Sequence, residues 1–177
     1  IYLSDTISFY IFILLKYNMY LVSWNEFESL SMELAKQIMA SNKKYFAIIT
    51  VNRGGLLLGR ILSGTLGVPL GIISAKYMPD KKNYIIDKNI SFLYDMYGEF
   101  QGNILLIDDV FEETGNDIKK VIMKNNKKIK NIDLGCVFYK SKDSFKPDFY
   151  INQIKHDINI IFPYQEKALL SDLRDSD

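Results

Sequence analysis

Apolar and polar positions along this chain switch between the period of a strand and the period of a helix. Short runs rich in β-branched residues predict strands at 45–51, 70–75, 104–107 and 132–139. Helical spacing of apolar positions predicts helices from about residue 24 to 38, over 56–66 and over 118–123. Strands that alternate with helices in this way predict a parallel α/β sheet with right-handed crossovers.

The first predicted helix has a clear start signal. The sequence Ser23-Trp24-Asn25-Glu26 has the S-x-x-E form of a capping box, in which the hydroxyl and the carboxylate satisfy free backbone amides. One face of this helix should pack inward, on the apolar side chains of Trp24, Phe27, Leu30, Leu34 and Ile38. The next helix should end at Gly67 and Pro69.

Residues 77–102 break the alternation with Pro, Asp, Lys, Asn and Tyr. This segment is too long for an ordinary connection between a strand and the next element. We therefore interpret it as a functional loop or a flexible excursion.

The first 18 residues do not fit the domain pattern. They contain an apolar run over 7–15 that is too short to span a bilayer, with no basic leader and no small-residue cleavage site. We expect Met19 to be the natural start, with residues 1–18 translated from upstream or poorly packed. Anchoring on a membrane surface is the less favoured interpretation. Residues 19–177 should then form a single domain.

Composition narrows the classes of function. A chain of 177 residues with 48% hydrophobic content can bury one well-formed core. The 22 basic and 21 acidic side chains nearly balance, which gives no support to a nucleic-acid or membrane partner. Six lysines, at 119, 120, 124, 127, 128 and 130, are better explained as a solvated helix face than as a nucleic-acid patch.

Two single residues limit the chemistry. With one cysteine the chain cannot form an internal disulfide, which fits a cytoplasmic location, and Cys136 is expected to be a core side chain rather than a nucleophile. His156 is the only histidine. A His/Cys metal site is therefore not expected, and neither is a nucleophile paired with histidine.

Asp108 and Asp109 raise the central question, because two adjacent carboxylates at the end of a buried strand repel each other. Ligands of parallel sheets bind beyond the carboxyl ends of the strands. Two further groups should lie at those ends, namely Arg53-Gly54-Gly55 and Lys140. Glycines let backbone amides approach an anion, and Arg53 adds a fixed positive charge.

Thr114-Gly115 should open a helix whose free amides and dipole form a phosphate site. Asp108 and Asp109 would then hold sugar hydroxyls or a divalent cation. Donors that arrive with the ligand would relieve the repulsion between the two carboxylates.

These motifs resemble a known family. The stretch ILLIDDVFEETGND, residues 104–117, resembles the signature of type I phosphoribosyltransferases. The stretch AIITVNRGGLLLGRILSGTLGVPL is similar to the pyrophosphate-loop region of the xanthine/guanine and archaeal hypoxanthine branch. FYKSKDSFKPDFY and INIIFPYQE resemble the base-binding hood of that branch, so the match runs from Ser23 to Glu166.

The resemblance implies a three-layer parallel sheet of the type I phosphoribosyltransferase fold with a small C-terminal hood at about 140–166. It implies a phosphoribosyltransferase that moves ribose 5-phosphate from phosphoribosyl pyrophosphate to a 6-oxopurine (hypoxanthine, guanine or xanthine) in nucleotide salvage. Magnesium would be the cofactor, and the chain would form a homodimer or a higher homo-oligomer.

The resemblance also implies roles at the phosphate and ribose positions. Arg53 and Gly54 would bind pyrophosphate. Asp108 and Asp109 would bind the ribose hydroxyls and, through the substrate, magnesium. The amides that would hold the 5-phosphate are those of Thr114, Gly115, Asn116 and Asp117.

The base would be bound by a second group of residues. Glu112 or Glu113 would act as the general acid/base, and Lys140 would donate to the 6-oxo group. Asn159 and Ile160 would line the base pocket. The 77–102 segment would close over the reacting centre.

The chain departs from the family pattern in three ways. The family usually has one residue between Asp-Asp-Val and the acidic residue before Thr-Gly, whereas Phe111, Glu112 and Glu113 make this spacer one residue longer here. The loop ends in Asp117, where the family has Thr or Ser. Asn159 stands where an aromatic residue commonly stacks on the purine. These departures keep open a non-catalytic regulator on the same fold that senses a nucleotide or phosphoribosyl pyrophosphate.

Two other hypotheses are weaker. A phosphate-accepting receiver domain carries its acidic pair near the chain start and needs an acceptor Asp one strand later, and no suitable strand-end Asp follows here. Simple capping of a turn by Asp108 and Asp109 would leave the RGG and hood resemblances unexplained.

Overall fold

The computed structural model describes residues 18–78, 83–86, 91–92, 99–112, 114–140 and 146–165. The chain divides into two compact units, the larger over Leu30–Ile154 and the smaller made of Ile1–Ser29 and Lys155–Asp177. Several predictions lie outside the described residues: the segment 1–17, most of the 77–102 connection, Glu113, and the hood residues 141–145 and 166.

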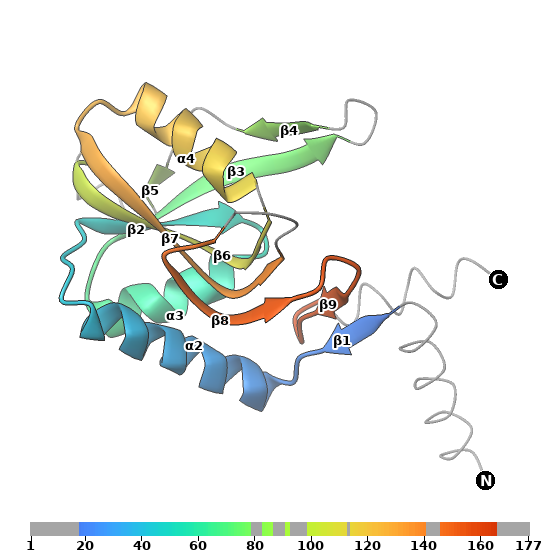
Figure 1. Ribbon diagram of the computed structural model, residues 1–177. Helices are drawn as coiled ribbons and strands as arrows, with labels where there is room; N and C mark the ends of the chain where they lie inside the picture. Colours follow the sequence, from blue (N-terminus) through green and yellow to red (C-terminus); the bar gives the residue numbers. More distant parts are fainter. Residues whose placement is uncertain are drawn as a thin grey trace, which may run out of the picture. The chain divides into compact units, whose positions relative to one another are not determined.

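The larger unit is built on one sheet with the strand order β4-β3-β2-β6-β7-β8, and β5 pairs with β3 (Figure 1). The inner strands from β3 to β8 pair in parallel, while β4 and β5 run antiparallel to β3. The strands are β2 (Ala47–Asn52), β3 (Leu70–Met78), β4 (Asn83–Ile86), β5 (Ser91–Phe92), β6 (Gly102–Phe111), β7 (Ile129–Lys140) and β8 (Phe149–Ile154).

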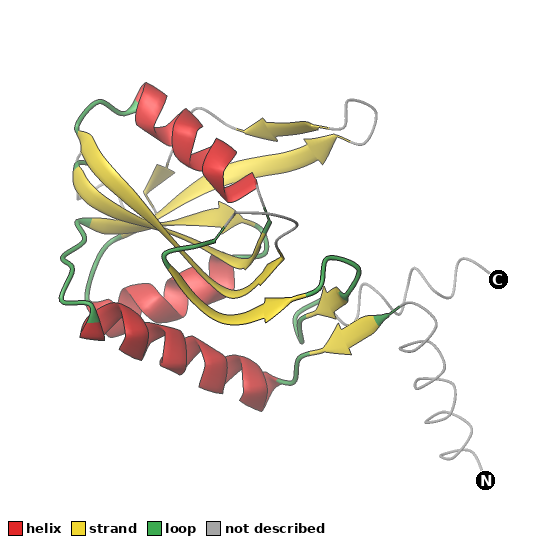
Figure 2. Ribbon diagram, in the orientation of Figure 1, coloured by secondary structure: helices red, strands yellow, loops and turns green. Residues whose placement is uncertain are grey.

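Helices cover both faces of this sheet, which gives the three layers that the sequence predicts (Figure 2). Helix α3 (Leu56–Leu66) follows β2 on one face, and α4 (Thr114–Asn125) follows β6 on the other. The C-terminal part of α2 (Trp24–Ala40) lies next to α3, since both contribute walls to one pocket. The predicted α/β fold class is confirmed.

The core lies between the sheet and its helices. On the α4 side it contains Ile49, Leu106 and Ile118 together with the thiol of Cys136, so the prediction that Cys136 is a core residue is confirmed. Strands β2 and β6 are buried along almost their whole length because both of their faces are covered. They therefore form a rigid base for the residues at their carboxyl ends.

The helix ends agree with the sequence signals only in part. Ser23 Oγ accepts the amide hydrogen of Glu26 at 3.2 Å, as a capping box requires. The Glu26 carboxylate, however, accepts the hydroxyl of Tyr20. Gly67 ends α3 with φ 65°, a left-handed conformation that glycine adopts without strain. The prediction that Trp24 packs inward is wrong, because its side chain is 57% exposed.

Several elements extend beyond their predicted bounds. Strand β6 continues to Phe111 instead of stopping at residue 107. Helix α4 begins at Thr114, which confirms that Thr114-Gly115 opens a helix, although the apolar spacing marked this helix only from residue 118. The 77–102 segment is not one loop, since β3 runs to Met78 and the strands β4 and β5 follow. A pattern of apolar residues marks the buried middle of an element better than its exposed ends.

The smaller unit holds a two-stranded parallel pairing that the sequence did not reveal. Strand β1 (Met19–Leu21) pairs with β9 (Asn159–Ile161), with Met19 opposite Asn159. The rings of Phe27, Phe162 and Tyr164 pack beside one another with centroids 5.4–5.8 Å apart. Among the described helices of the chain, none is long and apolar enough to cross a membrane.

A buried carboxylate joins the amino ends of the strands. Asp133 near the start of β7 accepts hydrogen bonds from Lys43 at 2.8 Å, Tyr45 at 2.6 Å and Asn131 at 2.8 Å. Burial raises the pKa of Asp133, but these hydrogen bonds outweigh it and hold the pKa below its usual value. This cluster, the Asp133 cluster, ties the segment before β2 to β7.

Candidate active site

The carboxyl ends of three neighbouring strands carry the predicted site residues. Strands β2, β6 and β7 are adjacent in the sheet, and each pair is parallel, so their carboxyl ends lie at one edge. Arg53-Gly54-Gly55 follows β2, Asp108 and Asp109 lie near the end of β6, and Lys140 is the last residue of β7. This edge is where parallel sheets bind ligands.

The loop after β2 packs directly on the acidic pair. A Cβ built on Gly54 would lie 2.7 Å from both carboxylate oxygens of Asp109. A Cβ on Gly55 would lie 2.8 Å from the carbonyl oxygen of Ile107 and 2.9 Å from the Cα of Asp108. A side chain at position 55 would collide with the backbone of β6, and one at position 54 would have to displace the Asp109 carboxylate, so close approach explains both glycines. The peptide bond between Asn52 and Arg53, at the start of this loop, is cis.

The acidic pair is held by the backbone. Asp108 Oδ1 accepts the amide of Asp109 at 2.9 Å, and Asp109 Oδ1 accepts the amide of Val110 at 2.8 Å. Burial raises the pKa of Asp108 well above its usual value, and the charge of Asp109 raises it further, while backbone amides of Asp109 and Gly55 act against both. Both effects disfavour the ionised form of Asp108 in the ligand-free site.

Glu112 and Lys140 meet at the ends of β6 and β7. The pairing of Phe111 with Tyr139 places the next residues of both strands side by side. Lys140 Nζ lies 3.6 Å from Glu112 Oε1, with the two side chains 12% and 38% exposed. The structure thus brings together the predicted general acid/base and the predicted partner of the base.

Helix α4 presents its N-terminus at the same edge. Its first turn contains Thr114, Gly115, Asn116 and Asp117, as the phosphate-site prediction requires. The amide of Gly115 donates to the carbonyl of Glu112 at 3.2 Å. Asp117 pairs with Lys120 at 3.0 Å, and both side chains are mostly exposed. The negative charge of Asp117 therefore has a cationic partner on its own helix.

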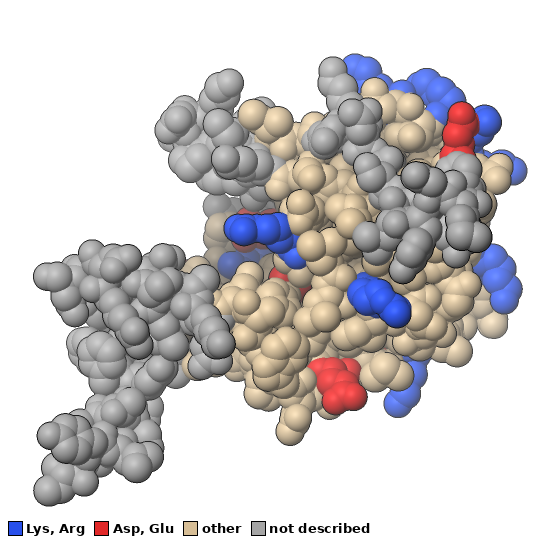
Figure 3. Space-filling view, turned by 180° about the vertical axis from the view of Figure 1, so that it is seen from behind, with Lys and Arg blue, Asp and Glu red and all other residues tan. Residues whose placement is uncertain are grey.

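Other predicted site residues are not joined to this group. Arg53 is exposed and forms no ion pair within the described part of the chain. Asn159 and Ile160 lie in β9 of the smaller unit, so their roles in a base pocket stay predictions. On the face shown in Figure 3, Lys and Arg side chains lie singly or in small groups separated by uncharged surface.

The residues present fit magnesium that is bound together with a substrate. Across the described ranges, no group of three or more His, Cys, Asp or Glu could hold a metal ion. Magnesium is commonly held by one or two carboxylates plus substrate phosphates. Asp108 and Asp109 supply these two carboxylates. The described residues do not supply a complete set of protein ligands for a metal ion.

Sequence reasoning missed Thr50, which lies beneath the Gly54-Gly55 loop. Its hydroxyl is fully buried, makes no hydrogen bond to any described residue, and lies 2.6 Å from the position of a Cβ on Gly55. The signal in the sequence was a lone hydroxyl in the otherwise apolar run AIIT. Thr50 also borders Gly59 of α3, so it fills the space where the loop turns into the helix.

Comparison with known proteins gives a consistent result. The family model described as phosphoribosyl transferase domain matches residues 20–169. A purine phosphoribosyltransferase from Pyrococcus horikoshii is similar in structure, with a TM-score of 0.68, 24% identity, and coverage of 83% of this chain and 93% of that one. The Helicobacter pylori xanthine-guanine-hypoxanthine phosphoribosyltransferase gives 0.64 and 21%, covering 89% and 99%.

A third similar structure is a hypothetical protein from Neisseria gonorrhoeae with bound ppGpp. Its TM-score is 0.62 at 15% identity, with coverage of 88% of this chain and 97% of that one. At these identities the solved structures establish a shared fold.

Proposed function

Because the chain belongs to the phosphoribosyltransferase family, we propose that it transfers ribose 5-phosphate from phosphoribosyl pyrophosphate to a 6-oxopurine in nucleotide salvage. One observation carries the proposal: the Gly54-Gly55 loop packs on Asp108 and Asp109 at the edge where α4 begins. An anion-binding loop, a hydroxyl-binding acidic pair and a helix N-terminus match the three parts of this substrate.

Each part of the substrate has a binding group in this proposal. Arg53 and the amide of Gly54 bind pyrophosphate, and the first turn of α4 binds the 5-phosphate. Asp108 and Asp109 accept the ribose hydroxyls and, through the substrate, hold magnesium, which the family generally uses with phosphoribosyl pyrophosphate. When bound, the metal supplies positive charge that neutralises the departing pyrophosphate. The ribose hydroxyls and the magnesium ion offset the mutual repulsion of the two carboxylates.

The reaction needs positioning more than an activated nucleophile. The bond from the anomeric carbon to pyrophosphate breaks, and a ring nitrogen of the purine forms the new bond. Positive charge develops on the sugar while the leaving group gains negative charge. Glu112 or Glu113 accepts the proton from the purine nitrogen, and Lys140 donates to the 6-oxo oxygen. Lys140 Nζ and Glu112 Oε1 lie 3.6 Å apart, so both groups can act on the same purine.

A pyrophosphate-release assay tests the proposed function. Purified protein is mixed with magnesium, phosphoribosyl pyrophosphate and a panel of purine and pyrimidine bases. Release that depends on a 6-oxopurine is the expected result. Binding of phosphoribosyl pyrophosphate without release with any base would show a regulator instead of an enzyme.

Hypoxanthine and guanine should outcompete adenine. The Lys140 ammonium can donate to an oxo group but has no acceptor for an amino group. We expect at least about a tenfold preference in kcat/KM, because a mismatched base leaves a buried donor unpaired. Lys140→Gln should narrow this preference, since an amide can both donate and accept. Initial rates with the two bases in competition measure the effect.

Lys130→Gln is the matched control, because Lys130 is exposed near the opposite end of β7. It should leave the base preference unchanged. A wild-type preference for adenine or a pyrimidine would overturn the assignment of the base. An unchanged preference in Lys140→Gln would show that Lys140 does not select the base.

A second candidate is a regulator that binds a nucleotide or phosphoribosyl pyrophosphate without catalysis. The observation that favours it is Asp117 in the first turn of α4, where a carboxylate would face the 5-phosphate. The similar structure from Neisseria gonorrhoeae was solved with a nucleotide, ppGpp. The two candidates differ in whether Asp117 repels phosphate, and a variant at this position can separate them.

Asp117→Thr should change the affinity for phosphoribosyl pyrophosphate less than threefold. The ion pair with Lys120 already turns the carboxylate along the helix and partly neutralises it. Removing an exposed pair three residues apart should lower the free energy of unfolding by only about 0.2–0.5 kcal/mol. Titration calorimetry with magnesium and phosphoribosyl pyrophosphate, together with urea unfolding, measures both quantities.

Lys120→Gln removes the same ion pair from the other side. It should have a similar cost in stability but should weaken binding of phosphoribosyl pyrophosphate, because the charge of Asp117 loses its partner. A gain of about tenfold or more in affinity for Asp117→Thr would instead show that Asp117 opposes phosphate, as a regulator with weak substrate binding requires.

A further inference from the structure

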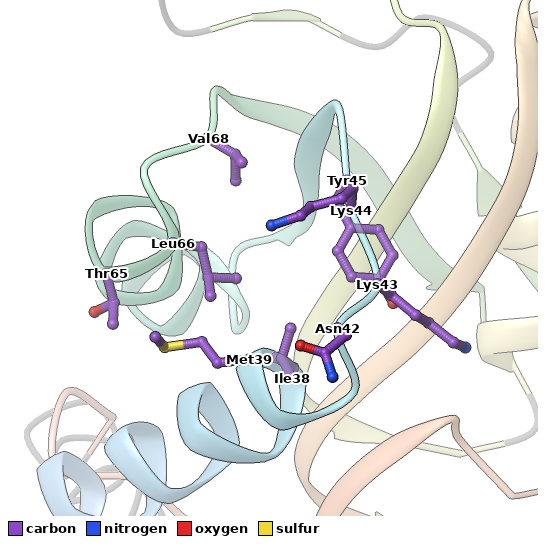
Figure 4. Close-up of a pocket in the computed structure, with 9 residues that line it drawn as sticks. All are labelled: Ile38, Met39, Asn42, Lys43, Lys44, Tyr45, Thr65, Leu66 and Val68. Atoms are coloured by element: carbon purple, nitrogen blue, oxygen red, sulfur yellow. The ribbon is translucent and has the colours of Figure 1, made fainter.

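A pocket in the larger unit lies where α2 and α3 end and β2 begins (Figure 4). Its walls come from the last turns of the two helices, from the residues after α3, and from the segment that leads into β2. The Gly54-Gly55 loop joins the other ends of β2 and α3. The pocket and the proposed substrate site therefore lie at opposite ends of these two elements.

The size and the walls of the pocket suit a small ring. Its volume is about 260 Å³. A cavity of about 150 Å³ takes up benzene, so this pocket has room for one aromatic ring and an attached group. The apolar walls are supplied by Ile38, Met39, Leu66 and Val68, and an aromatic wall by the ring of Tyr45. Small-molecule sites commonly combine such walls with a few polar groups that fix the orientation of the ligand.

Three of the five polar side chains in the pocket already have partners in the fold. Tyr45 and Lys43 both donate to Asp133, at 2.6 and 2.8 Å. The hydroxyl of Thr65 donates to the carbonyl oxygen of Ile61 at 2.9 Å. These bonds hold the walls of the pocket in place before any ligand arrives.

The other two polar side chains are those of Asn42 and Lys44. Neither side chain has a hydrogen bond or an ion pair to another residue in the described part of the chain. Lys44 extends over the pocket toward Val68, whereas Lys43 points away from it (Figure 4). The described residues that line the pocket include no Asp or Glu. An ammonium and an amide are hydrogen-bond donors, so together they favour an acid group on the ligand.

The helix ends do not oppose this assignment. The C-terminal dipoles of α2 and α3 alone would disfavour an anion. Their carbonyl groups, however, are hydrogen-bonded within the fold. Ser63 accepts the amides of Gly67 and Val68, and Met39 accepts an amide from the turn after α2. The acid group of a ligand would therefore meet the ammonium of Lys44 rather than unbonded carbonyl oxygens.

We propose that this pocket binds a small molecule that carries one aromatic ring and one acid group, either a carboxylate or a phosphate. The ring packs between Tyr45 and Leu66, beside the flexible thioether of Met39, which makes favourable contacts with aromatic rings. The acid group pairs with the Lys44 ammonium. A charge-assisted hydrogen bond is about twice as strong as one between neutral groups, so this pair fixes the orientation of the ligand.

Titration calorimetry on the full chain tests the ligand class with benzoate and phenyl phosphate. At least one of them should saturate a single site with a dissociation constant of about 1 mM or lower, as expected for a compound of this size. The tighter of the two identifies the acid group. Benzyl alcohol lacks the acid and acetate lacks the ring, so each should bind at least about tenfold more weakly.

Variants of Lys44 test the pairing with the acid group. Lys44→Gln should weaken binding about fivefold, while Lys44→Arg keeps the charge and should retain binding. Lys36→Gln is the matched control, because Lys36 is an exposed lysine of α2 that does not line the pocket. It should bind like the wild type. Circular dichroism checks that each variant remains folded.

Arg53→Gln separates this pocket from the proposed substrate site, where an acid could also bind. The aromatic acid should bind this variant as it binds the wild type. Its amide NMR shifts should be largest at Lys44, Tyr45 and Leu66, not at Gly54. Loss of binding in Arg53→Gln with unchanged binding in Lys44→Gln would place the acid at the substrate site and overturn the proposal.

Absence of saturation by either compound at about 10 mM would overturn the proposal as well, since affinity would then be too weak for a formed site. Equal affinity for benzoate and benzyl alcohol would remove the role of the ammonium. None of these measurements uses pyrophosphate release. Failure of this proposal would therefore leave the proposed reaction standing, and a protein without transferase activity could still show the pocket to be a binding site.

Discussion

Asp108→Asn should make the ligand-free protein more stable and the substrate complex weaker. The wild-type side chain is half-buried beside the buried carboxylate of Asp109, and desolvation together with that neighbouring charge raises its pKa, so its ionisation costs free energy in the ligand-free protein. An amide of the same shape removes that cost. It also removes a charged acceptor worth about 1.5–3 kcal/mol, so affinity for magnesium and phosphoribosyl pyrophosphate should fall about tenfold to a hundredfold.

The gain in stability should depend on pH. In the unfolded chain this carboxyl ionises near its ordinary pKa of 3.8, and the folded protein has a higher pKa. Between the two values the folded state binds more protons than the unfolded state, so the free energy of unfolding falls as pH rises. The slope approaches about 1.4 kcal/mol per pH unit for one proton. The variant lacks this proton, so its advantage should grow as pH rises above 4.

Urea unfolding between pH 4.5 and 8, combined with titration calorimetry, measures both effects. Glu33→Gln is the matched control, because Glu33 is an exposed carboxylate on α2. It should change neither the pH slope nor the affinity. Asp109→Asn should weaken binding to a similar degree. Loss of stability in Asp108→Asn at pH 8, or unchanged affinity in both variants, would contradict the assignment of the acidic pair.

Gly55→Ala should damage both the fold and the site. Two of the atoms that its Cβ would approach to within 3 Å are backbone atoms of β6, a central strand with no room to move. Forcing one carbon into such a space costs about 1–3 kcal/mol. The shift would also separate the anion-binding loop from Asp108 and Asp109. Pyrophosphate release should fall at least tenfold, since small errors of position are costly in a reaction that depends on positioning.

Gly64→Ala is the control from the adjoining helix. A Cβ at this position would lie 2.8 Å from Arg60 Nη1, the tip of a flexible side chain that can turn away. Alanine is the better helix former, so the free energy of unfolding should rise by about 0.5–1 kcal/mol with unchanged activity. Equal stability in the two alanine variants would show that the loop after β2 can move away from β6.

The sequence was sufficient to predict the centre of the sheet and the location of the acidic pair. Strands β2, β6 and β7 are buried on both faces, so their apolar runs stand out. Asp108 and Asp109 follow four such residues and precede Thr-Gly, a pattern that locates the carboxyl-terminal part of a strand and a helix start, although β6 runs on to Phe111. These are local signals, and the structure confirms the elements that they predicted.

Features that depend on tertiary contacts could not be predicted in the same way. The pair of Lys140 with Glu112 arises from the register of β7 against β6, which no local pattern determines. Short outer strands such as β4 and β5 lack a long apolar run. Trp24 fits the apolar period of α2 yet lies at the edge of the buried face. Periodicity therefore predicts the direction of a side chain better than its exposure.

The Asp133 cluster affects how this protein can evolve. It stabilises the amino ends of the strands, whereas the proposed chemistry occupies their carboxyl ends. Stabilising substitutions often reduce activity when they fall in a strained or mobile active site. The Asp133 cluster adds stability at the other end of the sheet. Mutations can then alter the loops after β2 and β6, and with them the choice of substrate, while the fold that supports those loops is retained.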